Sequence, residues 1–340
     1  MRIWSSAGVK HPQSVFASVA IATIAALTAC SSESSQYAPS GSAGIISTAG
    51  AIHSMLIPVR SGPVIPHPDH SRSWMAKGAA GTALLYLSDY GTGDVYVYSW
   101  PNLALMGTLT GFTNPAGLCV DKTQNIWIVN YGAEDVVQYA HGGTSQIGSV
   151  SNNGYFPVGC AINKRTGALA VSDIESAGSG SGGITIYQNG RGTGKTYTDS
   201  SIPFVHFVGY DLRDNLFLDG QNPSGVFQLA KFKRGTFTSI TVSGGTINSP
   251  GGVQYDGGLL TVDDQVSSII YQMSEAGVIS GSTPMADQED CPQPFIRRKS
   301  VVCPNASGLD YLVYAYPAGG TPRKTITGSF SSPFGSAISL

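Results

Sequence analysis

Charged side chains are scarce in this sequence. Asp, Glu, Lys and Arg make up only 12% of its 340 residues, about half the share found in an ordinary soluble domain. A helical bundle or coiled coil is therefore not expected, because such folds draw heavily on Glu and Lys. The formal net charge of −2 provides no basic field, which argues against a nucleic-acid partner.

Glycine and tyrosine are abundant instead. The chain contains 43 Gly and 16 Tyr, and 41% of its residues are hydrophobic. This apolar content is too high for a disordered chain. A weakly charged sequence rich in Gly, Ser and Tyr is typical of an all-β protein with many turns.

The N-terminus has the pattern of a secretion signal. Arg2 and Lys10 precede an uncharged apolar run from Val15 to Leu27, which is short for a membrane span. The run ends in Leu-Thr-Ala-Cys, with the cysteine at Cys30. This motif resembles the bacterial lipobox, whose cysteine is acylated and becomes the mature N-terminus. The alternative is an ordinary secretory signal with an incidental Cys30, and both interpretations place the protein outside the cytoplasm.

These features divide the chain into three parts. We expect a lipoprotein signal peptide at residues 1–29, a lipidated N-terminus with a flexible tether at 30–80, and a folded domain at 81–340. Two or three acyl chains at Cys30 would give stable membrane anchoring. Ser31 follows the cysteine, and by analogy with lipoproteins this residue favours the outer membrane or the cell surface.

One pattern recurs six times in the folded domain. An apolar run ends in Asp or Asn, a short turn rich in Gly or Ser follows, and a second apolar run comes next. The spacings between the terminal residues are 41, 43, 46, 44 and 42, and weaker strand patterns complete most units. Four strands in a repeat of this length are typical of a propeller blade. The terminal residues are Asp89, Asn130, Asp173, Asp219, Asp263 and Asn305.

The two ends of the domain complement each other. The first unit lacks an opening strand, whereas residues 333–340 form an opening strand with no blade behind it. Pairing these ends would remove an open sheet edge. The sequence therefore predicts an all-β, six-bladed β-propeller with four-stranded blades, in which the C-terminal strand completes the first blade.

The repeat also resembles a known family. The segment Pro115-Ala-Gly-Leu-Cys-Val-Asp121, followed by Asn125-Ile-Trp-Ile-Val-Asn130, is similar to the repeats of NHL-type and related TolB-like six-bladed propellers. The resemblance covers about three quarters of the chain. It implies a fold and says little about activity.

The six terminal Asp and Asn residues are the most regular polar feature. As a ring near one face of the propeller, they could attract cations or sugar hydroxyls. Asp and Asn also close turns by bonding the backbone two residues further on, and this structural role is the favoured interpretation.

A channel-centred enzyme is the alternative to a binding protein. Gluconolactonase-like and virginiamycin B lyase-like propellers work with a metal in the channel, so resemblance to them would imply a metal-dependent hydrolase or lyase. The expected inner strands contain no Glu, and we predict neither a metal site nor a cofactor. The large polar candidates for the channel are His206, Tyr210, Gln254, Arg297 and Arg298.

The densest basic cluster is Arg297-Arg298-Lys299. It could face an anionic partner such as a phosphate or a uronate. A solvated edge is the alternative.

Four cysteines lie in the folded domain. Cys291 and Cys303 bracket one hairpin, and an oxidising compartment permits a disulfide between them. Cys119 and Cys160 lie on neighbouring inner strands, one position out of register, and we expect them to be buried free thiols.

The sequence therefore favours a lipid-anchored, monomeric propeller outside the cytoplasm. Its expected role is non-catalytic binding of a protein or a glycan, because Tyr-rich, weakly charged surfaces suit such ligands. A channel-centred hydrolase or lyase is the second reading, and a purely structural envelope component is the third.

Overall fold

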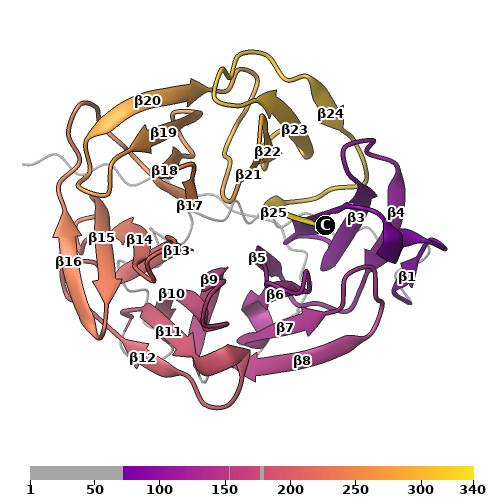
Figure 1. Cartoon of the computed structure of the whole chain (residues 1–340), viewed down its shortest axis with the longest axis horizontal. Coiled ribbons are helices and arrows are strands. Elements are labelled where there is room, and N and C mark those ends of the chain that lie inside the picture. The colour runs from indigo at the N-terminus through magenta and orange to yellow at the C-terminus, as the bar shows by residue number, and fades with distance from the viewer. Residues whose placement is uncertain (1–71, 153, 177–179) are drawn as a thin grey trace, which may run out of the picture. The chain divides into compact units, whose positions relative to one another are not determined.

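The computed structural model describes residues 72–152, 154–176 and 180–340. Six sheets stand around a central axis (Figure 1), so the fold is the expected all-β, six-bladed propeller. The signal peptide, Cys30 and most of the expected tether lie outside the described residues. Within the described part, no helix is long and apolar enough to span a bilayer.

The first three blades follow one another along the chain. Blade 1 contains β1 (Trp74–Met75), β2 (Leu84–Asp89), β3 (Asp94–Ser99), β4 (Leu105–Leu109) and β25 (Pro333–Ser339). Blade 2 contains β5 (Pro115–Val120), β6 (Ile126–Asn130), β7 (Asp135–Tyr139) and β8 (Gln146–Ser151). Blade 3 contains β9 (Tyr155–Ile162), β10 (Leu169–Ser176), β11 (Gly183–Tyr187) and β12 (Lys195–Tyr197).

The last three blades complete the circle. Blade 4 contains β13 (Phe204–Tyr210), β14 (Leu216–Gln221), β15 (Phe227–Lys233) and β16 (Thr236–Ile240). Blade 5 contains β17 (Pro250–Asp256), β18 (Leu259–Asp264), β19 (Ile269–Met273) and β20 (Ile279–Pro284). Blade 6 contains β21 (Phe295–Arg297), β22 (Ser300–Asn305), β23 (Asp310–Ala315) and β24 (Lys324–Ile326). Three short 3-10 turns are η1 (Ala79–Gly81), η2 (Tyr131–Ala133) and η3 (Gln188–Gly190).

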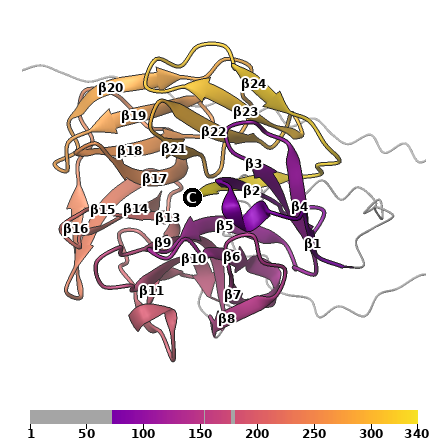
Figure 2. The same cartoon turned by 45° about the vertical axis from the view of Figure 1, so that its right-hand side comes forward.

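The C-terminal strand closes the ring as expected. β25 lies beside β2 (Figure 2) and pairs with it from Leu84↔Ser339 to Asp89↔Pro333. β1 was not expected, because the sequence assigns residues 74 and 75 to the tether. The structure pairs it with β4, through Trp74↔Thr108 and Met75↔Gly107. Blade 1 therefore has five strands, and the folded part begins before residue 81.

The inner strands come very close to one another at the level where each begins. A Cβ atom added to Gly117 of β5 would lie 2.6 Å from the carbonyl oxygen of Val158 and 2.8 Å from the Cα atom of Gly159, both on β9. Backbone atoms cannot move aside as a flexible side chain can. Glycine at this position is thus a packing requirement, and it sets the distance between blades 2 and 3.

Two disulfides cross-link the inner part of the propeller. Cys291 is joined to Cys303 within blade 6, 12 residues apart in sequence. Cys119 on β5 is joined to Cys160 on β9, with their Cα atoms 5.7 Å apart. The expectation of free thiols at Cys119 and Cys160 was therefore wrong. A one-residue offset along two close, twisted strands still leaves the Cα atoms within disulfide range.

Candidate binding cavity on the propeller axis

The six repeat-ending Asp and Asn residues do not occupy one register. Asp89 pairs with Pro333, and Asn130 pairs with Pro115, where the inner strands begin. In blade 5 the matching partner of Pro250 is Asp264, the residue after Asp263. In blade 4 the equivalent pair is Val205 with Gly220, the residue after Asp219. The six residues therefore do not form the single ring that the sequence suggests.

The residues at the turn register hold the chain together. They are Asp89, Asn130, Asp173 and Asn305, and all four are buried. Asp89 accepts hydrogen bonds from the backbone N–H groups of Gly91 and Thr92 and from those of Ser331 and Ser332. Burial raises the pKa of Asp89, and these four N–H groups oppose that rise. Asp89 thus ties the turn after β2 to the segment that leads into β25.

Asp219 and Asp263 point the other way, because successive residues of a strand alternate between its two faces. Asp219 accepts hydrogen bonds at 3.0 Å from the backbone N–H groups of Phe207 in its own blade and Gly251 in the next blade. Asp263 stands at the equivalent position of blade 5. In the next blade, blade 6, the residue that corresponds to Gly251 is Pro292. It comes just before Gln293, which forms a β-bridge to Gly335. Proline has no N–H to donate.

Asp263 is a buried carboxyl group without a hydrogen-bond partner in the described part of the chain. Both of its oxygens lack a hydrogen bond, and its exposed fraction is 0%. Burial raises the pKa of Asp263 well above its ordinary value, and the nearby carboxylates of Asp264 and Asp219 raise it further. The neutral, protonated form is the one that this position favours.

Aromatic rings fill the axis at the end where the inner strands begin. Phe207 of blade 4 lies 6.3 Å from Phe334 of blade 1, measured between ring centroids. Phe334 contacts Tyr90, Tyr90 contacts Tyr131, and Tyr131 stacks on Phe156. We call these five residues the aromatic plug. All but Phe156 are at least 90% buried, so water does not reach the rings from this end.

A cavity of about 650 Å³ opens at the other end of the axis. The final residues of all six inner strands line it, and we call it the central cavity. Four of the five polar residues expected in the channel lie here: Tyr210, Gln254, Arg297 and Arg298.

His206 is the exception among these candidates. It lies in the bulge of β13 opposite Asp219, one residue before Phe207 of the plug, and is 1% exposed. Burial lowers its pKa to about 3. A neutral imidazole sealed in the plug cannot reach a ligand in the cavity.

Gln254 lines the cavity but is committed to the fold. Its side-chain amide donates to the carbonyl oxygen of Ile296 and accepts from the N–H of Ile296, at 2.8 and 2.9 Å. It thus links β17 to β21, where a backbone pair is missing. Tyr210 is half-buried, and burial together with Asp214 raises the pKa of its phenol.

A lysine that the sequence analysis missed completes the cavity. Lys164, in the turn after β9, donates to the carbonyl oxygens of Val120 and Asp121 on blade 2. Burial lowers the pKa of Lys164, the carboxylate of Asp121 opposes that shift, and the positive charge of Arg297 adds to it. Lys164 and Arg297 belong to blades 3 and 6, which face each other across the axis. In the sequence, Lys164 lies just after an inner strand and Arg297 is the last residue of one.

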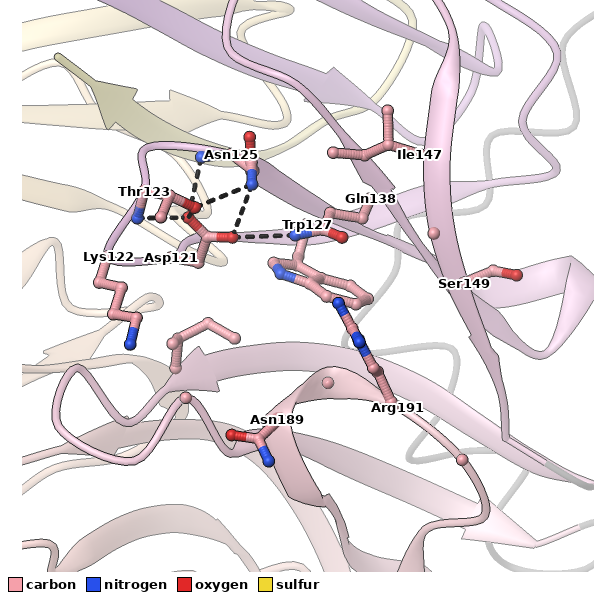
Figure 3. Close-up of a pocket in the computed structure, with 15 residues that line it drawn as sticks. Asp121, Lys122, Thr123, Asn125, Trp127, Gln138, Ile147, Ser149, Asn189 and Arg191 are labelled. Atoms are coloured by element: carbon pink, nitrogen blue, oxygen red, sulfur yellow. Dashed lines mark hydrogen bonds between the residues drawn. The ribbon is translucent and has the colours of Figure 1, made fainter.

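A second hollow lies between blades 2 and 3, away from the axis (Figure 3). It has a volume of about 510 Å³. Its carboxylate, Asp121, is occupied by hydrogen bonds from Thr123, Asn125 and Gln138. Its Trp127 is only 3% exposed and lies under the backbone of Gly190. The groove therefore offers no open aromatic face for stacking a sugar.

A metal-dependent enzyme needs several side chains that converge on one metal ion. Among residues 72–152, 154–176 and 180–340, no group of three or more His, Cys, Asp or Glu side chains is arranged to hold a metal ion. The charged residues that line the central cavity are four cations and three carboxylates: Lys164, Arg165, Arg297, Arg298, Asp211, Asp214 and Asp256.

Comparison with known proteins identifies the fold and no family. No family model matches the chain, and no curated protein matches it. The NHL-type resemblance therefore stays a prediction. A chain in the crystal structure of a nidogen–laminin complex is similar, with a TM-score of 0.64 and 10% identity, over 76% of this chain and 98% of that one. Because 1347 solved chains match in this way, the fold alone does not select an activity.

Proposed function

We propose that this protein is a non-catalytic binding module that holds a protein partner at its central cavity. The observation that carries the proposal is the cavity itself, which is open to solvent on the axis and lined from all six blades. Its volume is within the range of about 300–1,000 Å³ of ordinary ligand sites. The chain in the nidogen–laminin complex is a fold relative from an assembly of two proteins, which supports a protein as the partner.

The proposed place of action is outside the cytoplasm. Two disulfides within one propeller are the mark of an oxidising compartment. The lipobox-like segment before Cys30 agrees with that location, and we propose that acyl chains on Cys30 anchor the protein to a membrane. The propeller would then present a rigid binding face from that anchor.

Site-specific photo-crosslinking tests where the partner docks. Leu212 lines the central cavity and is 84% exposed, so a photoreactive phenylalanine analogue there should not disturb the core. Val226, 56% exposed, provides the matched control because it lies in the same blade at the opposite end of β14. The full chain carrying either residue is irradiated in cells that produce it, and adducts are identified by mass spectrometry.

The expected result is one recurrent protein adduct from position 212 and none from position 226. Adducts from position 226 alone would move the docking face to the other side of the propeller. An absence of adducts at both positions would also count against a protein-binding role for the cavity.

A further inference from the structure

We infer that the central cavity recognises a carboxylate, supplied by an acidic side chain of the protein partner. This inference rests on the proposed function, because it names the chemistry of the ligand at the same site. The observation behind it is the pair of cations that blades 3 and 6 bring to the cavity, Lys164 and Arg297.

The two cations are held in place without a direct ion pair, and the more distant carboxylate of Asp121 acts favourably on Lys164. Two backbone carbonyl oxygens of blade 2 fix the ammonium group of Lys164, which leaves one of its three donors available. Arg297 is half-buried, and its guanidinium carries five N–H donors. In the described part of the chain, no carboxylate lies within 4.0 Å of either group.

Most of the other charged side chains around the cavity have partners of their own. Arg165 forms an ion pair with Asp214. Asp211 is buried and accepts hydrogen bonds from the backbone N–H groups of Arg213 and Asn215. Asp256 also lines the cavity, and burial raises its pKa. Arg298, exposed at the rim, adds a further positive charge.

A bound carboxylate would use the N–H donors that the fold leaves open on Lys164 and Arg297. In a partly buried site its charge would interact favourably with both cations. Arg matches the planar oxygen pair of a carboxylate with two parallel hydrogen bonds, while Lys adds a point charge. The walls beneath these cations include Leu118, Val120 and Ile338. They suit the methylene groups of a Glu side chain.

Titration of the full mature chain with small probes tests the inference. The probes are a capped Ala-Glu-Ala tripeptide, its Ala-Gln-Ala counterpart, galacturonate and inorganic phosphate, with binding followed by ligand-observed NMR. The Glu peptide should bind at least about tenfold more tightly than the Gln peptide, since a hydrogen-bonded charge contributes roughly 1.5–3 kcal/mol. Its binding should weaken with added salt.

Variants locate the contact. Arg297→Gln and Lys164→Gln should each weaken Glu-peptide binding about tenfold, on the same energetic grounds. Lys122→Gln, which removes an exposed charge at the neighbouring groove, should leave binding unchanged. Thermal unfolding of each variant shows whether it is folded.

Four outcomes would overturn the inference. Equal binding of the Glu and Gln peptides, or no binding of either, would show that the cavity does not recognise a carboxylate side chain. Binding of galacturonate alone would make the source a glycan, and binding of phosphate alone would make it a phosphate ester. If adducts still form at position 212 in any of these cases, protein docking at the cavity stands and only its recognition of an acidic side chain fails.

Discussion

The hydroxyl group of Ser172 on blade 3 donates a 2.6 Å hydrogen bond to the backbone carbonyl of His206 on blade 4. Ser88 on blade 1 makes the equivalent bond to Ala116 on blade 2, at 2.5 Å. Asp219 occupies the same position and accepts from Gly251 on blade 5. This side-chain position thus joins three pairs of consecutive blades by polar bonds. In blade 5 it is occupied by Asp263, which makes no such bond within the described residues.

We predict that Asp263→Asn stabilises the protein at neutral pH. The raised folded-state pKa of Asp263 means that its contribution to stability is fully present below the unfolded pKa of about 3.9. This contribution is lost as the pH rises toward the folded pKa. The neutral amide avoids that loss. We expect about 1–3 kcal/mol of stabilisation near pH 7, and a difference that shrinks toward pH 4, measured by urea unfolding at both values.

Asp219→Asn is the matched control for this prediction. Its amide would face the N–H groups of Phe207 and Gly251 with one acceptor and one donor group, where Asp219 has two acceptors. It should therefore destabilise the protein. If Asp263→Asn also destabilises the protein at pH 7, the description of Asp263 as a carboxyl group without a hydrogen-bond partner is wrong.

The two disulfides should differ in their effect on stability. Cys119 and Cys160 are 41 residues apart, whereas Cys291 and Cys303 are 12 apart. In the chain-entropy description, the larger loop gives about 1 kcal/mol more stabilisation. Replacing the Cys119–Cys160 pair by serine should therefore lower the melting temperature more than replacing the other pair. Calorimetry of both double variants without reductant measures this, and equal losses would contradict the prediction.

Gly117→Ala should strain the junction between blades 2 and 3. The added methyl group would meet backbone atoms of Val158 and Gly159, and overpacking of this kind costs about 1–3 kcal/mol. Gly81→Ala is the control, because a Cβ there has no neighbour within 4 Å. Chemical denaturation of the two variants provides the comparison. A Gly117→Ala protein as stable as the control would show that the inner strands can separate freely.

The sequence predicted the architecture because each blade carries a visible period. The repeat-ending residues recur every 41–46 positions, and the unpaired strand segment at 333–340 matches the strand that the first unit lacks. β1 could not be predicted in the same way. It has only two residues, Trp74 and Met75, and no alternation can be seen over that length.

The errors at the candidate sites have a common cause, which is register. In Leu-Thr-Val-Asp-Asp the apolar run ends at Asp263, but the turn position belongs to Asp264. The one-residue difference reverses the face to which a side chain points. The Cys119–Cys160 bond and the approach of Lys164 to Arg297 depend on how blades lean together. The spacing of residues along the sequence does not reveal how neighbouring blades pack.

The aromatic plug has a kinetic consequence. With Phe207 meeting Phe334 across the axis, the propeller is not a conduit, and nothing that enters the cavity can continue through the molecule. A bound group must leave by the route through which it arrived. Arrival and departure rates therefore report on a single gate, whose walls are the hairpins that follow the inner strands.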